Sequence, residues 1–373
     1  MKILLIGTAW PYRGGLAAFN ERLIRAFRDQ GHDASIETFT LQYPRILFPG
    51  KTQYSASPAP DIPVVRTVHA LNPFNWLRVG NRLRKERYDF VIIKYWMPFM
   101  APCFGAIARR TRKNGHTKCI CIADNIVPHE PGIMDKPLTR YFVRSMDAFV
   151  VMSNSVMQDL AQFDRKKVRA LNPHPLFDNF GTSCDKATAC AQLHLDPAKR
   201  YILFFGFIRD YKGLDLLLKA MAEVHSDVAL IVAGEFYTAS APYVELIEKL
   251  QIKDRVFMFN HFIADEDVRY YFSAADLVVQ PYKHATQSGV TQIAYHFEVP
   301  MVVTRTGGLS EMVPDGRVGY VTNSSPTAIA TAIDTFFQED KGPYFRAQLR
   351  EEKQRFTWER MVQTITDLYR RIR

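Results

Sequence analysis

The chain has 373 residues, about twice the length of an ordinary single-core domain, which predicts two domains. Its 47% hydrophobic and 23% charged residues are typical of a water-soluble globular protein, and no apolar run approaches the roughly 20 residues that span a bilayer. Five scattered cysteines without a C-x-x-C pair favour reduced thiols and a cytoplasmic location. The opening MKILLIG is too short for a signal peptide and predicts a strand.

The net charge of +10 is unevenly distributed along the chain. Residues 1–170 contain 26 Lys and Arg against 13 Asp and Glu, whereas the remainder contains 22 against 25. The partner of the first half is therefore expected to be anionic, either a phosphorylated substrate or an anionic membrane surface. A nucleic acid is a weaker alternative, because the sequence has no nucleic-acid-binding motif and no Arg-rich repeat.

Strands and helices alternate through the first half. After the strand at 2–7, Gly14 and Gly15 lead into a helix that ends at Gly31. Glycines between a strand and a helix let a ligand approach the backbone at the positive end of the helix, although the dinucleotide fingerprint G-x-G-x-x-G is missing. Residues 40–65, with five prolines, predict a long loop. Further strands are predicted at 34–39, 89–94, 118–123, 147–152 and 168–171, and helices at 74–87, 99–114 and 156–163.

Two segments of the first half are candidates for function. Asp124 and His129 belong to a polar segment that directly follows the strand at 118–123, at the edge where parallel sheets bind ligands. We predict a catalytic role for both side chains, with an ordinary polar loop as the alternative. The helix at 74–87 carries Arg and Lys around an apolar stripe. It either covers the sheet or lies on an anionic membrane.

The second half opens with the strongest signal for an anion site. Residues 201–205 predict a buried strand that Gly206 closes, and a short loop with Arg209 and Lys212 then leads into a helix at Gly213. Two cations beside a helix N-terminus favour an anion, although two solvated charges on a plain turn remain the alternative.

Two more turns at the same edge strengthen this prediction. Gln287, Ser288, Gly289 and Val290 follow the strand at 276–280, and their amides can contact a phosphate. A glycine-rich turn that ends at Glu311 follows the strand at 300–304. The remaining strands are predicted at 228–233, 255–259 and 318–322, with helices at 213–225, 243–251, 265–274, 288–297, 325–338 and 356–372. The α/β pattern therefore predicts two doubly wound Rossmann-like domains facing a cleft.

These motifs resemble the retaining glycosyltransferases of family four, whose architecture is called GT-B. The resemblance covers nearly the whole chain and is carried by Gly14-Gly15 with Gly31-His32, by Gly206 with Lys212-Gly213, and by Pro300–Thr304 with Gly307-Gly308 and Glu311. It implies an acceptor-binding domain at 1–175 plus 356–373 and a nucleotide-sugar-binding domain at 176–355. The C-terminal helix, as in this family, would cross back onto the first domain.

The resemblance implies retaining transfer of a sugar from a nucleotide-diphosphate-sugar to a hydroxyl of a glycan or lipid-linked acceptor, in polysaccharide or glycoconjugate synthesis. It assigns the diphosphate to Lys212, with Arg209 in place of the family arginine, whose position holds Phe207. The family's acidic pair falls on Ala285 and Ile293, so the carboxylate that usually holds the ribose is missing. Gly14, Gly15, Gly206, Gln287, Ser288, Gly289, Val290 and Glu311 are the predicted donor-binding residues.

No cofactor is predicted, and no Cys/His cluster suggests a metal site, so the transfer is expected to be independent of metal ions. Docking at the inner membrane face is a further hypothesis from the charge of the first half. The missing acidic pair keeps open a catalytically idle GT-B subunit with a structural or regulatory role. A sugar-nucleotide epimerase is a third alternative.

Overall fold

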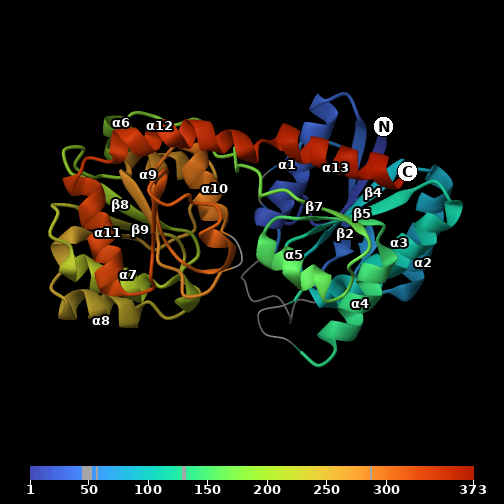
Figure 1. Ribbon diagram of the computed structural model, residues 1–373, viewed down its shortest axis with the longest axis horizontal. Helices are drawn as coiled ribbons and strands as arrows, with labels where there is room; N and C mark the ends of the chain where they lie inside the picture. The colour runs from blue at the N-terminus through green and yellow to red at the C-terminus, as the bar shows by residue number, and fades with distance from the viewer. Residues whose placement is uncertain (44–52, 56–57, 128–131, 286–287) are drawn as a thin grey trace. The chain divides into compact units, whose positions relative to one another are not determined.

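The computed structural model describes residues 1–43, 53–55, 58–127, 132–285 and 288–373 (Figure 1). The chain divides into two compact units, the first formed by Met1–His174 with Trp358–Arg373 and the second by Pro175–Thr357. Each unit has its own sheet and its own hydrophobic core, with helices on both faces of the sheet.

The described part of the first unit contains a parallel sheet in the order β3-β2-β1-β4-β5-β6-β7. Its central strands are buried apolar runs, as expected where helices cover both faces of a parallel sheet. The strands are β1 Lys2–Ile6, β2 Asp33–Leu41, β3 Val64–His69, β4 Phe90–Tyr95, β5 Lys118–Ala123, β6 Ala148–Val151 and β7 Val168–Leu171. The helices are α1 Gly15–Asp29, α2 Pro73–Glu86, α3 Ala101–Thr111, α4 Asp135–Ser145 and α5 Asn154–Ala161.

The C-terminal helix α13, Trp358–Ile372, packs on the first unit beside α1 (Figure 1). Its buried side chains recur at three- and four-residue spacing and join the core formed by β1, β4 and α1. The ring of Trp358 lies 5.2 Å from that of Phe19, and the ring of Tyr369 lies 5.0 Å from that of Phe90. The prediction that the last helix crosses back to the first domain is confirmed.

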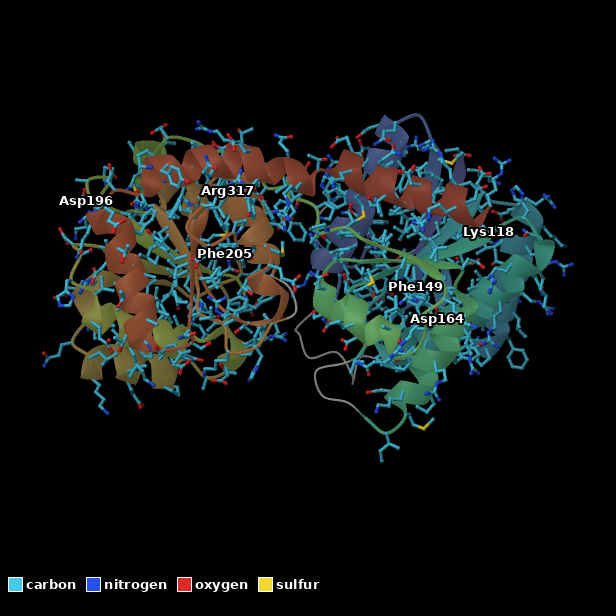
Figure 2. All side chains as sticks on the ribbon, in the orientation of Figure 1. Lys118, Phe149, Asp164, Asp196, Phe205 and Arg317 are labelled. Carbon is cyan, nitrogen blue, oxygen red and sulfur yellow. The ribbon has the colours of Figure 1, made fainter. Side chains whose placement is uncertain are left out.

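The second unit contains a parallel sheet in the order β10-β9-β8-β11-β12-β13. Its described strands are β8 Tyr201–Phe205, β9 Ala229–Ala233, β10 Val256–Phe259, β11 Leu277–Gln280, β12 Met301–Thr304 and β13 Gly319–Thr322. Its described helices are α6 Lys186–Gln192, α7 Leu214–Glu223, α8 Ala241–Lys249, α9 Val268–Ala274, α10 Gly289–His296, α11 Pro326–Gln338 and α12 Gly342–Glu352. Side chains fill both units, among them Phe149 on β6 and Phe205 on β8 (Figure 2). The prediction of two doubly wound parallel sheets is confirmed.

Several elements differ from the sequence prediction. The loop predicted at 40–65 is shorter at both ends, because β2 extends to Leu41 and the unpredicted strand β3 begins at Val64, and residues 44–52 and 56–57 lie outside the described ranges. Strand β3 lies at the sheet edge, where Val65 and Arg66 are exposed, so its sequence lacks a long apolar run. Helices α4, α6 and α12 were not predicted from the sequence. Each of these helices begins at or near a polar or proline-containing stretch with few apolar residues, so its sequence gives little helical signal. Packing against the sheet stabilises them as helices.

Candidate functional site

The turn between β8 and α7 has a backbone shape that depends on its glycines. Gly206 ends β8 with φ 90°, and Gly213 caps the short 3₁₀ turn Asp210–Lys212 with φ 70°. A side chain at Gly213 would overlap the carbonyl oxygen of Pro281, which follows β11. Only glycine therefore fits the left-handed conformation and the close approach at this position. The turn fixes Lys212 two residues before Leu214, the first residue of α7.

Lys212 is a buried cation without a described counter-charge. Its side chain is only 8% exposed, and its ammonium lies 5.8 Å from the ring centre of Tyr282. Burial, and then the nearby charge of Arg209, lowers the pKa of Lys212 to about 8. Among the described residues no carboxylate and no hydrogen-bond acceptor contacts the Lys212 ammonium. Because a buried charge is costly without a partner, this position favours an anionic ligand.

Lys283, on the neighbouring turn after β11, provides a contrast. Its ammonium lies 2.9 Å from Asp210 and 3.0 Å from Asp215, and these carboxylates raise its pKa despite some burial. Lys283 therefore ties the turn after β11 to the turn after β8. Lys212 has no such role in the described structure.

Arg209 is exposed on the same turn. Its guanidinium lies 4.7 Å from the ring centre of Tyr237, a cation–π contact. The ring of Phe207, at the family arginine position, lies 4.7 Å from the same Tyr237 ring. The charge of Arg209 is close enough to lower the pKa of Lys212. The two predicted cations are therefore neighbours, while their catalytic roles stay predictions.

The start of α10 lies beside this turn. Val290 has a methyl group 3.7 Å from the point where a side chain on Gly206 would begin. Ser288, the residue before α10, is buried, and its hydroxyl lies 3.2 Å from that of Tyr282. The Ser288 side chain does not cap the helix, so the first amides of α10 have no side-chain partner of that kind. Gln287, predicted as a donor contact, lies outside the described residues.

The third glycine turn follows β12. The hydroxyls of Thr304 and Thr306 donate hydrogen bonds to the carbonyl oxygen of Tyr282, at 2.6 and 3.2 Å. These bonds tie the turn after β12 to the turn after β11. Glu311, which follows this turn, is exposed.

The position of the family's second glutamate is apolar core in this chain. Ile293 is 6% exposed and packs in the hydrophobic core of the second unit, and the half-buried Ala285 packs against the same core. Neither position therefore provides the carboxylate that holds the ribose in the family.

In the first unit, Gly14 and Gly15 line a pocket of about 210 Å³. Gly14 has φ 107°, and open space surrounds the positions where side chains on either glycine would begin. Thr8 and Gln42, which follow β1 and β2, also line the pocket, and each has a buried oxygen without a hydrogen bond among the described residues. Sequence reasoning missed both, although polar residues directly after buried strands were a usable signal.

Asp124 lies at the end of β5, as predicted, but it is engaged in an ion pair. Its carboxylate accepts a hydrogen bond of 2.7 Å from the ammonium of Lys94, a β4 residue that is 1% exposed. Burial lowers the pKa of Lys94, and the charge of Asp124 opposes this shift. The Lys94 ammonium also lies 3.5 Å from the ring centre of Phe19. His129, the other predicted catalytic residue, lies outside the described residues.

The described residues contain no group of three or more His, Cys, Asp or Glu side chains placed to hold a metal ion. Metal-independent chemistry stays a prediction. None of the helices within the described ranges combines the length and hydropathy of a membrane-spanning helix.

Two family models match the chain, one in each unit. The model described as Glycosyltransferase Family 4 matches residues 13–173, and the model described as Glycosyl transferases group 1 matches residues 199–339. A curated relative from Mycolicibacterium gilvum, named D-inositol 3-phosphate glycosyltransferase, is 30% identical over 61% of this chain and 53% of its own length. A relative of the same name from Xylanimonas cellulosilytica is 23% identical over 95% of this chain and 91% of its own length. The chain spans about half the length of the relative from Mycolicibacterium gilvum and of one of the same name from Segniliparus rotundus.

Solved structures share the fold at low sequence identity. HepE from Anabaena in complex with UDP has a TM-score of 0.76 and 19% identity, covering 98% of this chain and 99% of its own. Sucrose-phosphate synthase from Thermosynechococcus elongatus has a TM-score of 0.74 and 18% identity, covering 100% of this chain and 99% of its own. The likeness extends through both units and shows the two-Rossmann GT-B architecture.

Proposed function

We propose that this chain, which belongs to glycosyltransferase family 4, transfers a glycosyl group from a nucleoside diphosphate sugar to an acceptor hydroxyl. The single observation that carries the proposal is the buried ammonium of Lys212, which has no described counter-charge and lies beside Gly206 and the ring of Tyr282. The family membership of both units and the UDP or UDP-glucose bound to the structural neighbour HepE support a nucleotide-sugar donor.

The second unit stabilises the leaving group. Cleavage of the sugar–phosphate bond places negative charge on the departing diphosphate and positive charge on the anomeric carbon. Lys212, Arg209 and the amides of Ser288 and Gly289 at the start of α10 receive the negative charge without a metal ion. Retention follows if the acceptor hydroxyl attacks from the face that the phosphate leaves, with a phosphate oxygen taking the proton.

The acceptor is bound by the first unit. The buried oxygens of Thr8 and Gln42 in the pocket beside Gly14 and Gly15 suit the hydroxyl groups of a glycan or lipid-linked sugar, because hydroxyls donate to such oxygens. The amides of Gly14 and Gly15 stay predicted donor contacts. Asp124 is proposed to position a substrate hydroxyl through the carboxylate oxygen that Lys94 does not hold.

A ligand screen followed by a transfer assay tests the function. UDP, GDP and ADP are compared for their effect on Tm, and a nucleotide that binds at 100 times its Kd is expected to stabilise the folded chain by about 2.7 kcal/mol. Its sugar derivative is then offered with candidate acceptors, and a mass increase of one sugar residue on the acceptor is the expected result. Nucleotide binding without any transfer or hydrolysis would instead favour the idle subunit, and isomerisation of the sugar without an acceptor product would favour an epimerase.

The affinity for a diphosphate is expected to fall at alkaline pH. The pKa of Lys212 is lowered to about 8 in the unliganded chain, so raising the pH through this value removes the cation that the anion needs. Between pH 7 and pH 9 the Kd for UDP should rise roughly tenfold, because each unit above the pKa removes a further factor of ten of the charged form. Calorimetric titration at each pH measures the Kd for UDP. Lys212→Met should bind more weakly and show no comparable change over the same range.

The lowered pKa of Lys212 weakens UDP binding at alkaline pH, but it makes the unliganded chain more stable there. Between pH 8 and the ordinary lysine value the unfolded chain binds the Lys212 proton and the unliganded folded chain does not. The free energy of unfolding should therefore rise with pH through this window relative to Lys212→Met. If the free energy of unfolding rises over the same pH range in which UDP binding weakens, loss of the Lys212 proton accounts for both changes.

Helix α2 is proposed to dock the chain on an anionic membrane, where a lipid-linked acceptor is found. Phe74 is 83% exposed, and Leu77, Arg78 and Lys85 are exposed on the same helix. Flotation with liposomes containing anionic lipid should carry the wild-type chain, and Phe74→Ser with Leu77→Ser should reduce the floated fraction several-fold. Equal flotation of the variant, or none of the wild type, would contradict this docking surface.

A further inference from the structure

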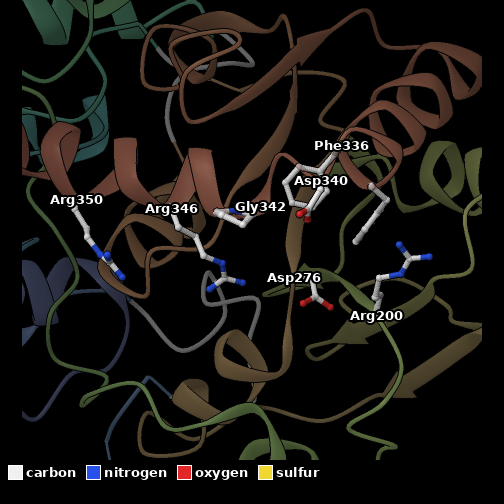
Figure 3. Close-up of a pocket in the computed structure, with 9 residues that line it drawn as sticks. Arg200, Asp276, Phe336, Asp340, Gly342, Arg346 and Arg350 are labelled. Atoms are coloured by element: carbon white, nitrogen blue, oxygen red, sulfur yellow. The ribbon is translucent and has the colours of Figure 1, made fainter.

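A second and larger cavity lies in the second unit, at the edge of the sheet where β8 and β11 begin (Figure 3). Its volume is about 470 Å³. Arg200 and Asp276, which line it, directly precede β8 and β11, whereas Lys212 follows β8. Because the strands are parallel, the cavity and the turns around Lys212 lie at opposite edges of the same sheet. The cavity is therefore a site separate from the proposed donor site.

Three guanidinium groups line this cavity, from Arg200, Arg346 and Arg350. The Arg350 guanidinium is held by the carboxylate of Glu298 at 2.7 Å. Arg346, half-buried on α12, has no hydrogen bond and no ion pair among the described residues. Its side chain extends from α12 into the cavity, and Arg200 lies on the far side of Asp276 (Figure 3).

The carboxylate of Asp276 leaves these cations available. It accepts hydrogen bonds from the ammonium of Lys186 at 2.7 Å and from the amide of Tyr201 at 2.8 Å. Arg200 donates only through Nε, to the carbonyl oxygen of Asp227, and its guanidinium stacks on the ring of Phe337 at 5.1 Å. Within the described residues its two terminal nitrogens have no acceptor.

The start of α12 adds a favourable field. Gly342 and Pro343, the first residues of this helix, line the cavity, and the helix has no side-chain cap and no acidic residue in its first turn. Its positive end therefore faces the same space as the uncommitted guanidinium groups. Together they favour a compact dianion over a neutral ligand.

We propose that this cavity binds a phosphorylated sugar. The guanidinium group of Arg346 and the positive end of α12 bind the phosphate, since the planar fork of arginine matches phosphate oxygens. The carboxylate of Asp340, which lines the cavity and is exposed, accepts hydrogen bonds from sugar hydroxyls, and the half-buried ring of Phe337 packs against the C–H face of the sugar. The volume lies within the range of pockets for small organic ligands.

Calorimetric titration of the full chain with glucose 6-phosphate tests the proposal. Saturable binding is expected for the wild-type chain and for Lys212→Met, which disables only the donor site. Arg346→Gln should weaken binding about tenfold or more, because one charge-assisted contact is lost. Lys219→Gln, which removes an exposed cation on α7, is the charge-matched control and should bind normally. Circular dichroism verifies that each variant is folded.

Three results would overturn the assignment. One is the absence of saturable binding to the wild-type chain. Another is binding that Lys212→Met abolishes and Arg346→Gln retains, which would place the ligand in the donor site. The third is inorganic phosphate, or unphosphorylated glucose, binding as tightly as glucose 6-phosphate, which would remove either the sugar or the phosphate from the proposed recognition.

Discussion

Replacement of Lys212 by methionine is expected to lower kcat for glycosyl transfer by about 100-fold or more. The Lys212 ammonium is the cation of the site that is both buried and without a described counter-charge. A charge in such a place interacts strongly with the negative charge that develops on the departing diphosphate, since water screens it little. Steady-state kinetics with the donor identified in the nucleotide screen measure the effect.

The same substitution should leave the fold intact. Methionine keeps the unbranched apolar stem of Lys212 and removes a charge whose burial is costly in the unliganded chain. The Tm of Lys212→Met is therefore expected to equal or exceed that of the wild type, while its activity falls. Lys219→Met, an exposed position on α7, is the matched control and should keep both activity and Tm. Near-normal kcat for Lys212→Met would contradict the role assigned to this residue.

The sequence predicted the sheets well because burial on both faces leaves a local signal. Tyr201–Phe205 is a five-residue apolar run that ends at a glycine, and it forms β8 as expected. The edge strand β3 gave no such signal, because only one side of it packs and Arg66 and Thr67 interrupt the apolar residues. Helix α12 begins with Gly342 and Pro343, which read as a loop, and its place is set by tertiary packing of Phe345 and Leu349.

The sequence predicted only those parts of the candidate site that are formed by residues close together in the chain. The spacing from Gly206 to Gly213 specifies a turn in which Lys212 precedes a helix, and a local pattern is enough to find it. Two properties of that turn needed the folded chain. Burial gives Lys212 its lowered pKa, and Asp210 and Asp215 neutralise Lys283 but not Lys212. Residue type alone cannot tell a committed cation from an available one.

The pairing of Asp124 with Lys94 was beyond sequence reasoning for a similar reason. The two residues are 30 positions apart, Lys94 on β4 and Asp124 directly after the neighbouring strand β5, and a lone lysine in the apolar stretch FVIIKYW gives no sign of its partner. The sequence correctly placed Asp124 at the carboxyl edge of the sheet. It could not reveal that the carboxylate compensates a buried charge, a structural role that competes with the predicted catalytic one.

Removal of Asp124 is therefore expected to have a large effect on stability. Asp124→Ala leaves the ammonium of Lys94 buried and unpaired, which should lower the free energy of unfolding of the first unit by about 3 kcal/mol. The loss should shrink as the pH rises, because burial has already lowered the pKa of Lys94 and the unpaired amine can release its proton. Urea unfolding at two pH values measures both effects.

The double variant Lys94→Met with Asp124→Ala separates the structural role from the catalytic one. Both charges are then absent, so most of the lost stability should return. If Asp124 positions a substrate hydroxyl, kcat should remain low in the stable double variant, because the carboxylate is still missing. Recovery of kcat along with stability would show that the ion pair only supports the fold at the end of β5, and the catalytic assignment of Asp124 would be wrong.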